Sequence, residues 1–329
     1  MGALQKRICL TCIIFTFLTI LPPSSFAFWL WTRESGKWVN PKYAAKDTAE
    51  EQFCWAAEFF KADNYKRAID EYRKIPKNFP ESPYAARAQL AIGASYYEMN
   101  KFDQAFEAYQ KVIDNYPHSD FVKEALELEE KLAQNFLEKN SAGRFLTPQH
   151  TLYNKAGKIY QQIVDNFPFQ SRAPELQYKA GWTYYKAGNF EKAIEACRKL
   201  KKNYPESIWA AESSFMIGLI YWEQSPRVLA YHQDAINKAV ESFQSFIKNY
   251  PENARVKEAK EYLCDLKNRQ GEYLFNIGEY YYKNQGSLRA ASIYYKKLSE
   301  NFNATPWGGK AGERLLEIEE IERRIDSVK

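Results

Sequence analysis

The chain is poor in the residues that interrupt helices or hold metal ions. Among its 329 residues there are only 14 glycines, 14 prolines, five cysteines and three histidines. The scarcity of glycine and proline argues against a turn-rich β fold and favours helices. No histidine has a second histidine or a cysteine at metal-ligand spacing, so we expect neither a metal ion nor a cofactor.

The motifs of common catalytic centres are also missing. The sequence has no glycine-rich phosphate loop, no G-x-S-x-G and, beyond its N-terminal segment, no C-x-x-C. Pairs of carboxylates such as Glu129 and Glu130 are abundant, and we expect them on solvated helix faces. The net charge of +5 comes from acids and bases that alternate along the chain. This pattern differs from a basic stripe, so we expect no nucleic-acid partner. Because the catalytic motifs are missing, we also do not expect an enzyme.

The first 27 residues have the features of a secretory signal. Lys6 and Arg7 precede an apolar run over residues 8–21, which is too short to span a bilayer. A proline pair and small residues follow, so we expect residues 1–27 to be a signal peptide cleaved after Ala27. The alternative is an uncleaved anchor, extended by the aromatic residues that start at Phe28.

Cysteine usage bears on both anchoring and disulfides. A bacterial lipid anchor needs a cysteine just after the apolar run, and none stands there, so the sequence does not support a lipid anchor. After cleavage three cysteines are left, Cys54, Cys197 and Cys264, and their spacing does not decide whether any two are paired. Cys197 stands at a large apolar position of the repeat described next, so we expect it to be a small buried hydrophobe.

An internal repeat dominates the rest of the chain. The segment "GWTYYKAGNFEKAIEACRKLKKNYP" (181–205) matches "GASYYEMNKFDQAFEAYQKVIDNYP" (93–117) at most characteristic positions. The spacing is that of the tetratricopeptide pattern, in which each unit is a pair of antiparallel helices. We expect the small residues Gly181 and Ala193 to face each other, and the proline to end the second helix.

These patterns predict an all-α, tetratricopeptide-like helical solenoid of about six helix pairs plus a C-terminal capping helix. The expected repeat domain spans residues 48–329. It follows an aromatic N-terminal arm, residues 28–47, which either lies on the first repeat or docks on a membrane or partner. The expected units are 48–80, 81–117, 118–168, 169–205, 206–251 and 252–303, with the cap at 304–329.

Stacked units of this kind present the first helix of each pair along a groove that binds peptides. Aromatic side chains suit such a groove because they give a large contact area with few rotamers to freeze. Our peptide-groove candidates are Tyr97, Tyr185 and Trp222. The alternative for each is packing between repeats.

The sixth unit carries a family resemblance. Its "LKNRQGEYLFNIGEYYYKNQGSLRAASIYYKKLSENF" and the insertion in the fifth unit resemble the BamD family of outer-membrane assembly lipoproteins. The resemblance covers roughly residues 48–303. It implies a non-enzymatic scaffold in the periplasm, at the inner face of the outer membrane. Its partners would be the periplasmic domains of the barrel insertase, unfolded outer-membrane proteins and other assembly subunits.

Within that resemblance, Arg269 matches an arginine of the family that faces the insertase. Glu272 and Tyr273 are nearby candidates, and the alternative for Arg269 is an ordinary helix-surface charge. The chain departs from the family because no cysteine stands at the expected mature N-terminus, so membrane association would be peripheral. The alternative function is a soluble periplasmic adaptor for envelope or cell-division complexes, similar to the CpoB family, although the coiled coil usual there is not visible.

Overall fold

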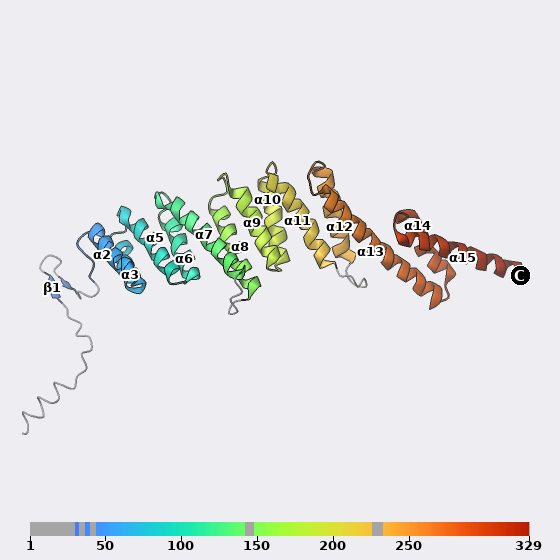
Figure 1. Cartoon of the computed structure of the whole chain (residues 1–329), viewed down its shortest axis with the longest axis horizontal. Coiled ribbons are helices and arrows are strands. Elements are labelled where there is room, and N and C mark those ends of the chain that lie inside the picture. Colours follow the sequence, from blue (N-terminus) through green and yellow to red (C-terminus); the bar gives the residue numbers. More distant parts are fainter. Residues whose placement is uncertain (1–29, 33–36, 40–43, 142–147, 226–232, 329) are drawn as a thin grey trace, which may run out of the picture. The chain divides into compact units, whose positions relative to one another are not determined.

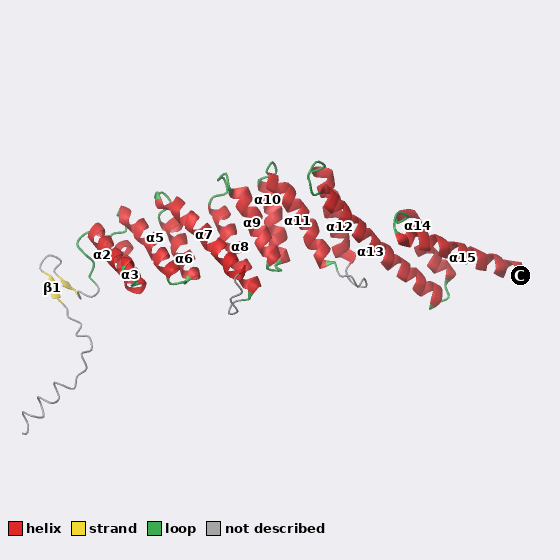
Figure 2. Ribbon diagram, in the orientation of Figure 1, coloured by secondary structure: helices red, strands yellow, loops and turns green. Residues whose placement is uncertain are grey.

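The computed structural model describes residues 30–32, 37–39, 44–141, 148–225 and 233–328 (Figure 1). The predicted signal peptide and the predicted cleavage point lie outside the described residues, as does the alternative uncleaved anchor apart from its end at Trp31. Helices make up nearly everything else (Figure 2). Their bounds are α2 Ala49–Lys61, α3 Tyr65–Tyr72, α4 Lys74–Asn78, α5 Pro83–Glu98, α6 Phe102–Asn115, α7 Phe121–Ser141, α8 Gln149–Asn166, α9 Ala173–Lys186, α10 Phe190–Asn203, α11 Ile208–Gln224, α12 Gln233–Asn249, α13 Val256–Lys283, α14 Leu288–Asn301 and α15 Pro306–Val328.

The described helices pack as the repeat pattern predicts. Helix α5 pairs with α6, α9 with α10, α11 with α12 and α13 with α14. The first helices of successive pairs also contact each other: α9 contacts α11, and α11 contacts α13. The prediction of an all-α, tetratricopeptide-like fold is confirmed. The chain divides into two compact units between Ala125 and Leu126, so each is described separately. A single repeat domain over 48–329 stays a prediction.

Each second helix ends in the same way. Helices α6, α8, α10 and α12 stop at an asparagine, and an aromatic residue follows, with φ near −135° at Tyr116 and Tyr204. Proline comes next and disfavours the helical conformation of the residue before it. The expected role of proline in ending the second helix is therefore confirmed at Pro117 and Pro205.

The turn between the two helices of a pair needs a left-handed residue. Gly188 takes this position in α9–α10 with φ of +72°, and Asn100 and Asp63 take it in the first two pairs of the chain, with φ of +58° and +55°. Small polar residues and glycine tolerate this conformation. Asn189 instead accepts a hydrogen bond from the Lys192 amide and so caps α10.

The small residues of the first helices have different neighbours from those we expected. A Cβ atom added to Gly93 would lie 2.3 Å from the Tyr109 ring, and one added to Gly181 would lie 3.1 Å from Cys197 Sγ. The expected facing of Gly181 and Ala193 is therefore incomplete, because Cys197, four positions after Ala193, lies nearer than the Ala193 carbonyl at 3.7 Å. Ala193 is fully buried and lies beside this contact. Glycine is needed so that a side chain of the second helix can cross the first helix closely.

A buried glutamine links the two helices in several pairs. Gln89 donates to the Ala108 carbonyl at 3.0 Å, Gln177 to the Ala196 carbonyl at 3.2 Å, and Gln52 to the Glu71 carbonyl at 3.1 Å. Each satisfies a polar group that burial would otherwise leave unpaired. The repeat thus contains a polar contact that the apolar pattern did not reveal.

The N-terminal arm contains a short hairpin that the sequence analysis did not predict. Strands β1 (Leu30–Thr32) and β2 (Lys37–Val39) pair antiparallel, with Trp31 opposite Trp38. The two rings meet edge to face at 5.9 Å and stay 55% and 62% exposed. Nearer the repeat, the arm contacts the first helices, because the Lys46 amide donates to the Gln52 side chain at 2.8 Å and Lys74 donates to the Ala44 carbonyl at 3.0 Å. Docking of the exposed tryptophans on a membrane or a partner stays a prediction.

One expectation about surface carboxylates is wrong. Glu129 is fully buried, and the Glu130 side chain is only 12% exposed. Glu130 accepts from Arg172 at 2.7 Å and pairs with Lys179 of α9 at 3.4 Å. Arg172 and Lys179 thus cover the Glu130 carboxylate. Among the described helices, none is long and apolar enough to cross a bilayer.

Candidate functional site

The first helices α11 and α13 bring together two residues that we proposed for different sites. Trp222 Nε1 donates to Asp265 Oδ2 at 2.6 Å, and the Arg269 guanidinium pairs with the same oxygen at 2.7 Å. Arg269 also lies over the Trp222 ring, 5.3 Å from its centroid, and donates to the Ser225 carbonyl at 3.2 Å. We call Trp222, Asp265 and Arg269 the tryptophan–arginine cluster. It stacks a cation on an aromatic face and fixes both through one carboxylate.

Arg269 is therefore mostly internal. Its side chain is 12% exposed, and its contacts within the described residues go to α11, to Ser225 directly after it and to its own helix. The alternative of an ordinary helix-surface charge does not fit this burial. Contact with a partner stays a prediction, and the structure gives Arg269 the additional role of positioning Trp222.

Glu272 and Tyr273 are half-buried residues of α13, one turn beyond Arg269. In the part of the chain that the structure describes, neither side chain makes a hydrogen bond or an ion pair. They are thus better placed than Arg269 for direct contact with a partner, because no internal contact would be lost. Their role in binding stays a prediction.

Tyr185 extends the same face to α9. Its hydroxyl donates to Glu223 of α11, the residue after Trp222, and its ring is tilted against Phe190 at 6.3 Å. Burial, together with this bond to a carboxylate, raises the pKa of Tyr185, so its hydroxyl stays a donor. Three consecutive first helices, α9, α11 and α13, therefore share one row of aromatic and polar side chains.

Tyr97 belongs to the N-terminal unit and is described apart from the others. It is half-buried, and its ring meets Phe102 edge to face at 5.5 Å. This contact lies within its own helix pair. The groove role of Tyr97, like that of Tyr185 and Trp222, stays a prediction.

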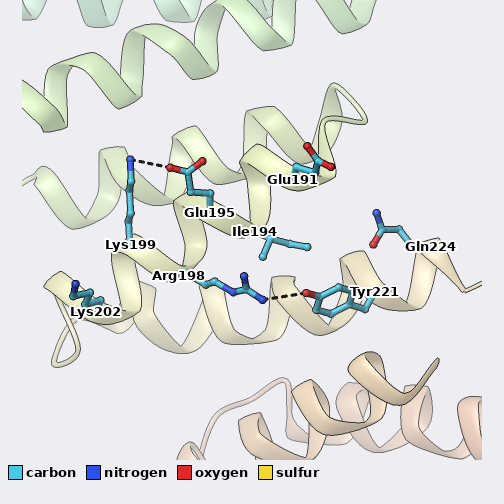
Figure 3. Close-up of a pocket in the computed structure, with 8 residues that line it drawn as sticks. All are labelled: Glu191, Ile194, Glu195, Arg198, Lys199, Lys202, Tyr221 and Gln224. Carbon is cyan, nitrogen blue, oxygen red and sulfur yellow. Dashed lines mark hydrogen bonds and ion pairs between the residues drawn. The ribbon is translucent and has the colours of Figure 1, made fainter. Parts of the chain in front are cut away.

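A second surface, which the sequence analysis missed, lies on the side of the second helices. A groove of about 470 Å³ between α10 and α11 continues into one of about 390 Å³ between α10, α11 and α12, and Arg198 and Tyr221 line both. We call this continuous surface the second-helix groove. Figure 3 shows Arg198 of α10 and Tyr221 of α11 pointing toward each other, and the guanidinium donates to the hydroxyl at 3.1 Å.

A change in the repeat marks this groove in the sequence. Gln89 and Gln177 each stand four residues before the first-helix glycine, but Ser214 stands four residues before Gly218. Ser214 Oγ is instead contacted by Lys201 of the neighbouring unit at 3.1 Å. Alignment of the units would have shown this loss of the linking glutamine, yet only the structure shows what replaces it.

Cys197 is buried as expected. It is fully inaccessible, its Sγ lies 3.6 Å from Met216 Sδ, and burial raises the pKa of its thiol to about 12. All three described cysteines are free, and Cys54 and Cys264 are exposed. Cys197 thus serves packing and carries no reactive thiolate.

Paired helices with close-packed glycines, buried second-helix aromatics and proline ends define a tetratricopeptide-class protein. The tetratricopeptide repeat model accordingly matches residues 87–119. The model of the YfiO family, described as outer membrane lipoprotein, matches residues 147–325. The chain belongs to this family, which is the BamD family that the sixth unit resembles. The comparison with curated protein sequences found no match.

Several solved structures are similar to this chain at low identity. A thermophilic tetratricopeptide protein of Thermus thermophilus is 12% identical over 66% of this chain and 99% of that chain, with a TM-score of 0.32. MamA of Desulfovibrio magneticus is 16% identical over 64% and 99%, with a TM-score of 0.28. Part of a repeat protein of Cytophaga hutchinsonii is 21% identical over 82% and 85%, with a TM-score of 0.31.

Proposed function

We propose that this protein is a non-enzymatic scaffold of outer-membrane barrel-protein assembly, working at the periplasmic face of the outer membrane. The observation that carries the proposal is the family match over α8 to α15, the region that holds the tryptophan–arginine cluster. A scaffold needs rigid side chains presented on packed helices, and this cluster supplies them. Its partners would be the periplasmic domains of the barrel insertase, unfolded barrel proteins and other assembly subunits.

Insertase binding is assigned to α13. Arg269 orders the Trp222 ring, while Glu272 and Tyr273 lie one turn further along without internal bonds among the described residues. A half-buried carboxylate and an aromatic ring with no partner in the described chain suit contact with a second protein. Arg269 would act mainly by holding this face in shape.

Unfolded barrel precursors are assigned to the N-terminal repeats, where Tyr97 is the candidate. The exposed Trp31–Trp38 pair is assigned to the membrane surface, because tryptophan side chains favour the boundary between lipid and water. A peripheral attachment of this kind fits an arm that directly follows the proposed cleavage point.

The test is binding to the purified periplasmic domains of the insertase. We expect Glu272→Lys and Tyr273→Ala each to weaken the complex about tenfold, or about 1.4 kcal/mol. The matched control is Lys267→Glu, an exposed charge reversal on the same helix, about 140° around from Glu272. Unchanged binding by both test variants would remove this part of α13 from the interface.

Co-purification from native membranes tests the broader proposal. Recovery of the insertase with the tagged protein supports the assembly scaffold. Recovery of cell-division or envelope proteins without the insertase would instead support the alternative of a soluble periplasmic adaptor.

A further inference from the structure

Three cations line the second-helix groove without a carboxylate partner among the described residues. Arg198, Lys201 and Lys202 lie within five residues on α10 and line the groove. Arg198 donates to the Tyr221 hydroxyl and Lys201 to the Ser214 hydroxyl. Over the residues that the structure describes, none of the three lies within ion-pair distance of a carboxylate. The groove therefore offers positive charge to a ligand.

Lys201 is the most informative of the three. It is half-buried, and burial, with a smaller contribution from Arg198, lowers the pKa of its ammonium group. A partly desolvated cation that is bonded only to a hydroxyl is less well stabilised than one paired with an anion. A carboxylate brought to Lys201 would supply the missing partner.

The repeat explains why a ligand can reach Lys201. In the preceding unit Gln177 fills the space between the paired helices and donates to the Ala196 carbonyl. The corresponding residue of the next unit is Ser214, and both it and Ser242 of α12 line the groove. The hydroxyls of Ser214 and Ser242 thus line the groove at the positions that Gln177 and Ala196 occupy in the preceding unit.

The groove also has an apolar side. Ile194 and Ile217 are only 8% and 7% exposed and line its floor beside the Tyr221 ring. Acidic residues stand at its rim, where Glu195 pairs with Lys199 at 3.2 Å and Glu241 is a further lining residue. An anionic bilayer spreads its charge over a flat surface and would face these carboxylates as well as the cations. A peptide segment can place its own acids against the cations and its apolar side chains against the floor.

We propose that the second-helix groove binds an acidic amphipathic segment of a partner protein. The proposal rests on the scaffold function proposed above but uses the second helices, away from the α13 contacts assigned to the insertase. The occupant is identified by charge complementarity to Arg198, Lys201 and Lys202 and by the apolar floor between them.

The test uses a dye-labelled peptide of about 18 residues with glutamate and leucine on opposite helical faces. Its counterpart with lysine for every glutamate is the peptide control. We expect the acidic peptide to bind residues 28–329 and the lysine peptide not to bind. Arg198→Glu with Lys202→Glu should weaken binding at least tenfold, and Lys201→Ala should weaken it severalfold, as measured by fluorescence anisotropy.

The matched protein control is Lys248→Glu with Lys260→Glu, which makes the same change in net charge at exposed positions outside the groove. Equal loss of binding by this control, no binding at all, or equal binding of both peptides would overturn the proposal. Circular dichroism melting of every variant separates lost binding from lost folding.

Two further outcomes would also overturn it. Binding of phosphatidylglycerol vesicles, with the same dependence on Arg198 and Lys202 and no peptide binding, would assign the groove to a lipid surface. Self-association that the Arg198→Glu, Lys202→Glu variant abolishes would assign it to a second copy of this chain. The same variant should still bind the insertase domains, so failure here leaves the proposed function standing.

Discussion

Arg269 lies over the ring of Trp222, with its guanidinium carbon 5.3 Å from the ring centroid, although the two residues belong to different helix pairs. Asp265 holds both, because Trp222 Nε1 and the Arg269 guanidinium converge on its Oδ2 atom. The geometry links α11 to α13 through three polar groups and one stacked ring. It fixes one first helix against the next in the described residues of the C-terminal unit.

Removing the carboxylate tests how much this contact stabilises the fold. We expect Asp265→Ala to lower the free energy of unfolding by about 1–3 kcal/mol, because Arg269 is largely buried and would lose its partner. The measurement is urea unfolding followed by circular dichroism. Asp234→Ala is the matched control, since Asp234 forms the same kind of pair with Lys238 at 79% and 49% exposure. That change should cost less than about 1 kcal/mol. Equal losses would show that the cluster adds nothing beyond a surface ion pair.

Two glycines at the same repeat position should tolerate alanine differently. A Cβ atom at Gly93 would overlap the buried Tyr109 ring at 2.3 Å, whereas one at Gly181 would meet Cys197 Sγ at 3.1 Å. We expect Gly93→Ala to destabilise by about 1–3 kcal/mol through overpacking. Gly181→Ala should cost less than about 1 kcal/mol, because alanine favours helix and the sulfur needs to move only slightly. Thermal melting of both variants measures which substitution destabilises more. A larger loss of stability for Gly181→Ala than for Gly93→Ala would contradict the assigned packing.

The C-terminal helix should be held in a pH-dependent way. Glu279 of α13 accepts from Arg314 of α15 at 2.7 Å, from Tyr295 at 2.8 Å and from Lys283 at 2.5 Å. Burial alone would raise the pKa of Glu279, but these hydrogen bonds outweigh it and hold the pKa below its usual value. A carboxylate with a lowered pKa adds stability above the unfolded pKa, near 4.5, and loses it as pH falls through the folded value.

Glu279→Gln should therefore cost about 1–3 kcal/mol at neutral pH. Below about pH 4.5 the wild type should lose stability more steeply than this variant, so the two unfolding free energies converge. Denaturation at a series of pH values measures this, with Glu300→Gln, an exposed residue of α14, as the control. A constant gap between wild type and Glu279→Gln down to low pH would rule out this role.

The cysteines should differ sharply in reactivity. Burial raises the pKa of Cys197 to about 12, so its thiolate is scarce at pH 8, whereas Cys54 and Cys264 are exposed. We expect a thiol reagent to label Cys54 and Cys264 of residues 28–329 quickly, and Cys197 only after unfolding. Peptide mapping by mass spectrometry identifies the labelled sites. Fast labelling of Cys197 in the native protein would show that α10 opens locally.

The helix pairs were predictable because their determinants are local. The proline after Tyr116 or Tyr204 ends a helix whatever lies around it, and Gly188 supplies the left-handed turn by its own conformational freedom. The residue facing each first-helix glycine was predicted less well. Helical spacing predicts on which face of a helix a side chain lies, but not how far that side chain extends across the neighbouring helix. The ring of Tyr109 therefore lies against Gly93, where we expected an alanine.

The candidate sites were predictable only as separate residues. Trp222 and Arg269 each stood out by type and position, but their contact joins two consecutive units, and the insertion within the fifth unit lies between the two residues in the sequence. The cations of α10 resembled an ordinary solvated helix face, because charge patterning alone does not reveal whether a carboxylate lies opposite.

By itself, the sequence determined that this chain forms paired helices and which residues begin and end most of them, because capping, turn and periodicity act over a few residues. The tertiary structure decided which side chains of different pairs meet: Trp222 with Arg269, Glu130 with Arg172, and Lys201 with Ser214. These contacts depend on the register and crossing of neighbouring helices, which many weak packing interactions set together.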